Sequence, residues 1–282
     1  MIELCNLGGR PFGAEVAMTI RKLMALAILL LAVRGASGET AQLEAIKTRG
    51  KLVALCFPTY DGAFSRPNLD RGPTRRVGQR ADFAGIDIEL AASLATRLGV
   101  ELEIHTLEEP GYSPLLPALL AGEADLVISS LSITDKRKEL VDFSEPYFSS
   151  YSLVVARKDA KIAIPADVAN KKAVAIPGSS HEEYLRELGL GKEQLVPAEF
   201  TSEYLTTLAE GQAELAVIDS DRVELDLAAF PELEVAFKLP KDDHYGIALP
   251  KNSDLLPAIN SWLAEIQKNG ELAEIFRRNP YH

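Results

Sequence analysis

Apolar and polar positions recur along this chain with two different periods. Between residues 87 and 98 the apolar side chains return every three or four positions, and Gly99 follows as a helix stop. Short apolar runs bounded by polar residues, such as residues 125–128, have the length of buried strands instead. The pattern predicts a packed amphipathic helix at the first place and a strand at the second.

Strands and helices of this kind follow one another in two sets. The predicted strands are residues 51–56, 101–107, 125–128, 173–176, 194–198 and 215–219. The predicted helices are residues 41–48, 87–98, 115–121, 182–188, 201–210, 254–268 and 271–278. Because strands alternate with helices, mostly parallel sheets are expected, and two α/β lobes accommodate the two sets better than one.

The two lobes are expected to be joined by extended chain. No Gly-rich or Pro-rich linker separates the two sets, and residues 149–155 and 239–247 are predicted to be the crossing strands. Paired crossings of this kind make a hinge. We therefore assign residues 39–149 plus 243–282 to lobe 1 and residues 150–242 to lobe 2.

The N-terminal segment has the order of a signal peptide. Arg21 and Lys22 precede an apolar run of 11 residues, and small residues follow up to Gly38. A helix needs about 20 residues to cross a bilayer, so a retained anchor is the weaker interpretation. We expect residues 1–38 to be removed, with Met18 as an alternative start, and the mature chain to be a periplasmic monomer without membrane insertion.

Cysteine content and charge exclude several classes of protein. Removal of the leader leaves Cys56 as the one cysteine, so no internal disulfide is expected. The chain has a formal net charge of −11, which argues against a nucleic acid partner. The four histidines show no metal-ligand spacing, and no phosphate-binding Gly loop appears, so no metal or cofactor is predicted.

Hydroxyl side chains follow the predicted strand at residues 125–128. Ligands of open α/β sheets bind beyond the carboxyl ends of strands, where Ser129, Ser130 and Ser132 fall. Arg137 comes about one helical turn later, and its planar guanidinium matches a carboxylate in two parallel hydrogen bonds. The alternative is that Arg137 and its lysine neighbours form a solvated helix face.

This segment resembles the bacterial extracellular solute-binding proteins of family 3, the polar amino acid receptors. The most specific motifs are SSLSIT-x-x-R and VDFSEPYF, and further matches run from about Gly50 to Asn279. The resemblance implies a periplasmic binding protein-like type II fold, with two lobes on a two-strand hinge and the ligand cleft between them. It also implies capture of a small polar ligand, foremost an amino acid, by lobe closure, and its delivery to the permease subunits of an ABC transporter.

Matching positions imply a set of ligand-binding residues. Arg137 corresponds to the carboxylate-binding arginine, with Ser130 and Ser132 beside it. In PGSSHEEY, the residues Gly178, Ser179 and Ser180 correspond to a second carboxylate contact at a helix N-terminus.

The second lobe and two aromatic positions complete that set. Asp219, at the end of a predicted strand, corresponds to the aspartate that holds the ligand's α-amino group, with a helix cap as the alternative. Tyr60 and Tyr112 match positions where the family packs a side chain on the ligand, although either could be ordinary core. Phe57 stands where cationic amino acid binders carry an aspartate, which puts a basic specificity in doubt.

Other interpretations stay open. The Arg-rich loop at residues 61–84 could recognise an acidic ligand or be a solvated loop tip. Cyclohexadienyl or arogenate dehydratases resemble the same scaffold, and Glu182 stands where such an enzyme places its catalytic acid; a Glu at a helix start is also an ordinary dipole partner. A lytic transglycosylase would need a further lysozyme-like domain, which is not expected after His282. A signalling receptor could replace the permease as partner.

Overall fold

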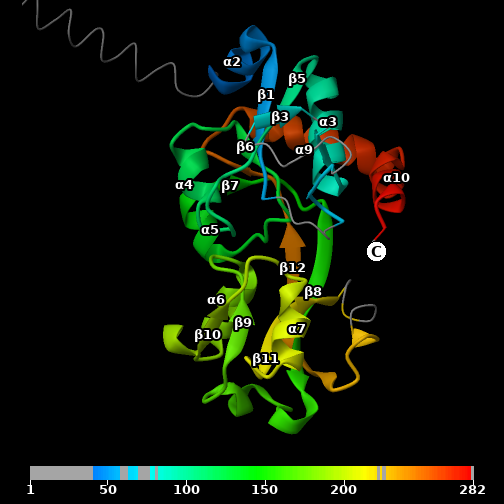
Figure 1. The fold of residues 1–282 in the computed structure, drawn as a ribbon. Helices are drawn as coiled ribbons and strands as arrows, with labels where there is room; N and C mark the ends of the chain where they lie inside the picture. Colours follow the sequence, from blue (N-terminus) through cyan, green and yellow to red (C-terminus); the bar gives the residue numbers. More distant parts are fainter. Residues whose placement is uncertain are drawn as a thin grey trace, which may run out of the picture. The chain divides into compact units, whose positions relative to one another are not determined.

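The computed structural model describes residues 41–57, 63–68, 77–79, 82–220, 223 and 227–280. The predicted signal peptide, its cleavage point, Tyr60 and most of the Arg-rich loop therefore lie outside the described residues. Two large sheets and one pair of short strands, β2 (Arg66–Pro67) with β4 (Phe83–Ala84), organise the described chain (Figure 1). No helix in these stretches is long and apolar enough to span a membrane.

The first sheet has six strands in the order β3-β5-β1-β6-β13-β7. These are β1 (Lys51–Leu55), β3 (Val77–Gln79), β5 (Glu101–His105), β6 (Leu126–Val127), β7 (Asp142–Phe143) and β13 (Ala248–Leu249). β1 pairs in parallel with β5 and β6, whereas β3 and β13 pair antiparallel with their neighbours. The sheet is thus mixed, because β3 and β13 each run opposite to the strands beside them.

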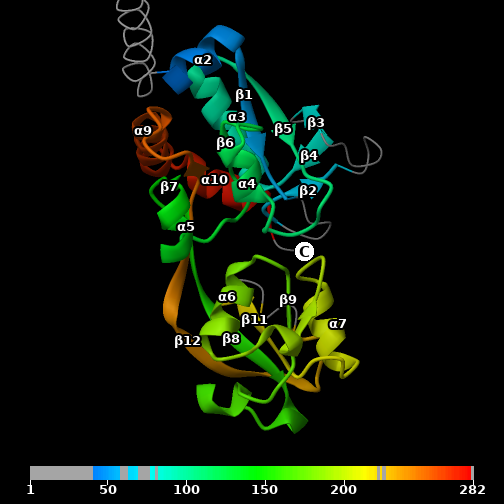
Figure 2. The same cartoon turned by 90° about the vertical axis from the view of Figure 1, so that its left-hand side faces the viewer.

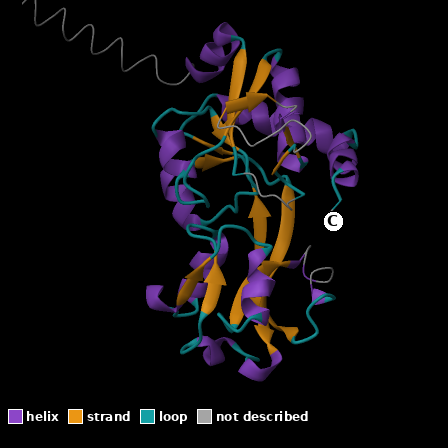
Figure 3. Cartoon of the chain, viewed as in Figure 1, coloured by secondary structure: helices purple, strands orange, loops and turns teal. Residues whose placement is uncertain are grey.

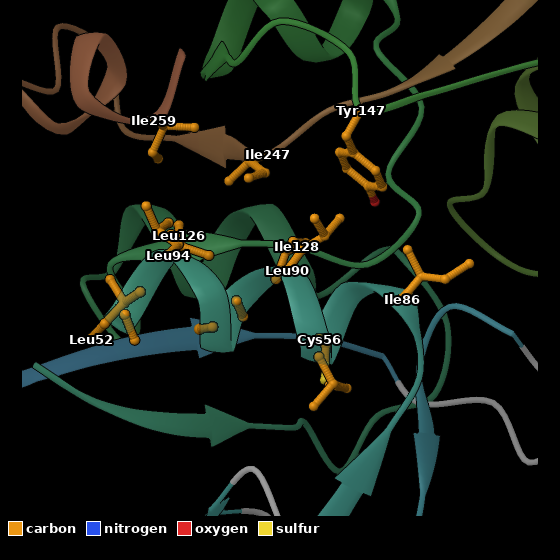
Figure 4. Packing of buried hydrophobic residues seen from close by; sticks show 14 of the residues in the cluster. Leu52, Cys56, Ile86, Leu90, Leu94, Leu126, Ile128, Tyr147, Ile247 and Ile259 are labelled. Carbon is orange, nitrogen blue, oxygen red and sulfur yellow. The ribbon is translucent and has the colours of Figure 1, made fainter. Parts of the chain in front are cut away.

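Helices cover both faces of the first sheet. One face, with Leu52 and Leu126, packs against α3 (Ile86–Leu98) and α9 (Leu255–Lys268). Figure 4 shows this core, in which Leu90 and Leu94 of α3 and Ile259 of α9 meet the strand side chains and the buried Cys56. The other face packs against α4 (Leu115–Leu120). The remaining helices here are α2 (Ala41–Arg49), α5 (Asp135–Leu140) and α10 (Glu271–Arg278).

The second sheet has five strands in the order β10-β9-β11-β8-β12. These are β8 (Phe148–Arg157), β9 (Ala173–Ala175), β10 (Leu195–Pro197), β11 (Leu215–Asp219) and β12 (Leu233–Tyr245). Alternate side chains of β9 and β11 point to opposite faces, one toward α6 (Ser180–Glu187) and one toward α7 (Glu203–Ala209). Figure 2 shows α6 and α7 on either side of these strands.

β8 and β12 connect the two sheets. Both are long, and they pair antiparallel from Arg157 and Leu233 to Phe148 and Tyr245 (Figure 3). β8 begins soon after β7 of the first sheet, and β12 ends just before β13. The predicted crossing segments, residues 149–155 and 239–247, fall in these strands or at their ends, as expected for a two-strand hinge. The exact lobe boundaries stay a prediction.

Most predicted elements are confirmed to within a few residues, but the sequence did not define α5 or the short strands β2, β3, β4, β7 and β13. α5 has only six residues and is fixed by its cap: the Thr134 hydroxyl accepts a hydrogen bond from the Arg137 backbone N–H at 3.3 Å. The two-residue and three-residue strands are shorter than any periodic signal. The described residues also contain the 3₁₀ turns Lys158–Ala160, Pro165–Val168 and Lys192–Gln194.

Candidate functional site

The turn after β6 is held in an unusual conformation. Ser130 has a φ of 43°, in the left-handed region that L-residues seldom adopt. Its backbone N–H donates to Asp87 Oδ2 at 2.8 Å, and the Tyr147 hydroxyl donates to Asp87 Oδ1 at 2.7 Å. Asp87 lies in the first turn of α3 and is 0% exposed. Asp87 was not among the predicted site residues, yet it anchors one of them, Ser130.

The guanidinium of Arg137 is buried and makes no hydrogen bond to a carboxylate within the described chain. Only 8% of the residue is exposed, because α5 directs it inward. Its Nη1 donates to the Ser132 carbonyl at 2.8 Å and its Nη2 to the Gly178 carbonyl at 3.0 Å. The solvated-face alternative is therefore wrong, and the pKa of Arg137 is lowered by burial. A guanidinium has five N–H donors, so donors remain for a further acceptor.

Gly178, Ser179 and Ser180 form the start of α6 as expected. Ser179 is the N-cap and accepts a hydrogen bond from the Glu182 backbone N–H at 3.1 Å. Gly178 has a φ of 74°, and a Cβ there would lie 2.4 Å from the Ser113 hydroxyl. Glycine at this position thus permits both the backbone conformation and the close approach of the chain before α4.

Hydroxyl groups link the turn after β6 to α6. The hydroxyls of Ser132 and Ser180 lie 2.8 Å apart, and that of Ser132 lies 2.9 Å from Asp243 Oδ2. Ser132 also forms an antiparallel bridge with Tyr245. Asp243 was not among the predicted residues, because β12 reads as a run of polar residues, KDDH, in which the sequence does not show which side chain faces inward.

Asp219 ends β11 and is surrounded by donors. Its Oδ2 accepts from the Tyr245 hydroxyl at 2.6 Å and lies 3.2 Å from His181 Nε2, while its Oδ1 lies 3.4 Å from the Ser152 hydroxyl. Burial alone would raise the pKa of Asp219, but the charge of His181 and these hydrogen bonds together lower it. Neither His181 nor Tyr245 was predicted to take part.

Aromatic rings lie beside these polar groups. The Tyr112 hydroxyl is 3.3 Å from the Ser130 hydroxyl, and the Tyr112 ring meets Phe57 edge to face at 5.5 Å between centroids. Phe57 also stacks on Phe200 at 6.2 Å. Phe57, which the sequence singled out only as a departure from basic specificity, therefore packs beside the predicted site.

The carboxylate of Glu182 is occupied by two structural partners. Its Oε2 accepts from the Gly178 backbone N–H at 2.7 Å. Its Oε1 accepts from Arg186 Nε at 3.0 Å and Nη2 at 2.6 Å. These contacts are those of a helix-start carboxylate that satisfies a free amide and pairs with a basic residue one turn later.

The predicted residues thus form two linked groups. One gathers Ser132, Arg137, Gly178 and Ser180 around spare guanidinium donors. The other gathers the carboxylate of Asp219 with its donors, and the bridge between Ser132 and Tyr245 connects the two. Chemically, the first group can hold an anion and the second a cation or hydrogen-bond donor.

Comparison with known proteins identifies relatives. A 200-residue stretch is 30% identical to membrane-bound lytic murein transglycosylase F of Desulfosudis oleivorans, covering 69% of this chain and 43% of that protein. The chain therefore spans less than half the length of that relative. Arginine-binding extracellular protein ArtP of Bacillus subtilis is 29% identical over 211 residues, covering 70% and 78% of the two chains.

A solved structure supports the same fold. The amino acid ABC transporter substrate-binding protein AbpA from Streptococcus pneumoniae, bound to L-arginine, superposes with a TM-score of 0.69 at 30% identity. The match covers 84% of this chain and 97% of that one. The fold is that of the type II periplasmic binding proteins, as predicted. Since the family model of the bacterial extracellular solute-binding proteins, family 3, also matches residues 70–279, the chain belongs to that family.

Proposed function

We propose that this chain binds a free amino acid, with Arg137 holding the α-carboxylate and Asp219 the α-ammonium group. The observation that carries the proposal is the buried Arg137 guanidinium, whose hydrogen bonds in the described chain go only to the backbone carbonyls of Ser132 and Gly178. Burying a guanidinium that has no hydrogen-bonded carboxylate costs free energy, and an anionic ligand would offset that cost.

The two ends of a zwitterion would draw the lobes together. Arg137 and Ser132 belong to the chain around the first sheet, whereas Gly178, Ser180 and Asp219 belong to the second. A ligand that contacts both sets has a higher affinity for the closed state and shifts the population toward it. We further propose that the closed form delivers the ligand to the permease of an ABC transporter, from a periplasmic, monomeric receptor.

The first probe is L-arginine, because ArtP and AbpA are named for or solved with arginine. Phe57, in place of the aspartate of cationic amino acid binders, favours a different side chain. A thermal-shift screen of the mature chain against the common amino acids decides between these. A specific ligand at a hundredfold excess over its Kd stabilises the folded state by about 2.7 kcal/mol.

Substitution at the site tests the assignment. Arg137→Ala is expected to weaken amino acid binding by about 2–5 kcal/mol, because the ligand's carboxylate would be buried unpaired. Lys138→Ala is the matched control, since Lys138 lies on the same helix with its side chain 55% exposed. Equal affinities of the Arg137→Ala variant and the wild type would refute the site, and no stabilisation of the wild type by any amino acid would refute the function.

Dehydratase activity is the second candidate, with Glu182 as the acid. The contacts of Glu182 with Gly178 and Arg186 speak against it, because both carboxylate oxygens are already occupied by an amide and a guanidinium of the same helix start. Incubation of the mature protein with prephenate or arogenate, followed by assay of the aromatic product, tests this directly. Turnover that is lost in Glu182→Gln would replace the binding proposal.

A further inference from the structure

Asp243 is a buried carboxylate that no part of the proposed function uses. Only 2% of the residue is exposed, although its neighbours Asp242 and His244 on β12 are exposed. This alternation is the ordinary one of a strand, with Asp243 on the inner side. In the register of β12 with β8, it lies opposite Ser150.

The hydrogen bonding of Asp243 is incomplete. Its Oδ2 accepts from the Ser132 hydroxyl at 2.9 Å, and within the described chain Oδ1 has no hydrogen-bond partner. A carboxylate has about four acceptor positions, and leaving them unfilled in a buried place costs free energy. Ser132 is one of the predicted ligand-binding residues, so this hydrogen bond places Asp243 beside the predicted site.

Asp243 lies among other charged and polar side chains. The groups that face it are Asp219 on β11, His181 and Tyr184 on α6, and Arg137 on α5. Asp219 has His181 as its own partner, so the permanently charged cation near Asp243 is Arg137, which the ligand's carboxylate would occupy. Burial first, and the charge of Asp219 second, raise the pKa of Asp243 to about 7.

We propose that Asp243 is a second ligand-binding carboxylate, which together with Asp219 holds the protonated amino group of the ligand. An ammonium group has three N–H donors, and Asp219 with its hydroxyl and imidazole partners needs only one of them. The inference rests on the proposed function and deepens it: the site selects ligands with a primary ammonium group over those with a hydroxyl in its place.

Binding should then be linked to a proton. A cation beside Asp243 favours its ionised form, so below pH 7 the ligand must displace the proton of Asp243 as it binds. Affinity is therefore expected to be about tenfold weaker at pH 6 than at pH 8. Binding of the ligand at the lower pH should release a proton.

The experiment uses isothermal titration of the full mature chain with L-arginine, or with whichever amino acid stabilises it most in the screen above. Asp243→Asn is expected to weaken binding about tenfold or more at pH 8. At pH 6, it should also remove the proton release that wild type is expected to show when the titration is repeated in two buffers of different ionisation enthalpy. Asp242→Asn, on the neighbouring exposed position, is the matched control and should bind within about twofold of wild type.

A ligand comparison isolates the ammonium group. Wild type should bind the amino acid much more tightly than its 2-hydroxy analogue. The ratio of these two affinities should be smaller in Asp243→Asn. If Asp243→Asn binds the amino acid as tightly as wild type, with the same proton release, the inference is overturned while the proposed function stands. If wild type binds no amino acid, both fail together, and the screen shows this before any variant is made.

Discussion

Asp87 gives the sharpest prediction about stability, because it is a fully buried carboxylate at the start of α3. Its oxygens accept from the hydroxyl of Tyr147 at 2.7 Å, the amide of Ser130 at 2.8 Å and the hydroxyl of Ser65 at 3.1 Å. Burial outweighs these hydrogen bonds and raises the pKa of Asp87 to about 6, from 3.8.

The raised pKa of Asp87 determines how the stability of the protein changes with pH. Since the pKa is higher in the folded than in the unfolded state, the protonated form favours folding. The contribution is fully present below pH 3.8 and is lost as the pH rises through about 6. The difference between the two pKa values corresponds to about 3 kcal/mol of unfolding free energy.

Asp87→Asn removes this titration while retaining one acceptor oxygen. Urea denaturation of wild type and variant between pH 4 and pH 8 measures the free energy of unfolding of each. The variant carries a constant cost from lost hydrogen bonds, but wild type should lose up to about 3 kcal/mol relative to it as the pH rises. If the difference in unfolding free energy between wild type and variant does not change with pH, folding does not raise the pKa of Asp87 and the reasoning is refuted.

Two further substitutions test the predicted site. Gly178→Ala should weaken amino acid binding in titration calorimetry and lower the melting temperature, because its Cβ would lie 2.4 Å from the Ser113 hydroxyl at a φ of 74°; unchanged affinity would mean that Gly178 and Ser113 need not approach when the ligand binds. Tyr245→Phe removes the 2.6 Å hydrogen bond to Asp219 and should cost about 1.5–3 kcal/mol of stability at pH 7. Because Asp219 has a lowered pKa, its stabilising effect is present above its unfolded pKa and lost as the pH falls through its folded pKa. In this variant the pKa of Asp219 is lowered less, so the loss in acid should be smaller and should be complete at a higher pH; an acid unfolding curve identical to that of wild type would contradict the role of Tyr245.

The sequence predicted the long elements well because their periodicity extends over several turns. α3 and α10 were placed within a residue of their bounds, and α9 likewise, since each shows a helical apolar stripe and ends near a stop signal. β2 and β3 were not predicted, because a strand of two or three residues is too short to show a periodic pattern of apolar positions. The mixed pairing of β13 was also out of reach, since it depends on a contact between distant parts of the chain.

The residues of the candidate site also fall into those that the sequence could select and those that it could not. Arg137 and Ser132 lie in a distinctive local motif, so a single sequence was enough to select them. His181 was passed over because a lone histidine at a helix start has many structural uses. Asp87 and Asp243 were missed for another reason: their importance comes from burial, and burial of one polar residue among several is decided by the packing of other elements around it.

The pairing of Phe148 with Tyr245 has a consequence for how the chain is assembled. The chain between these two residues, which carries the second sheet, leaves the first sheet and returns to it at adjacent points. In topology it is therefore an insertion into the chain that forms the first sheet. A ribosome would complete all of that insertion before it produced β13, the strand that joins β6 to β7. The first sheet, whose strand β1 is synthesised early, can therefore be completed only after the second sheet. A chain truncated after residue 245 would lack β13, the strand between β6 and β7.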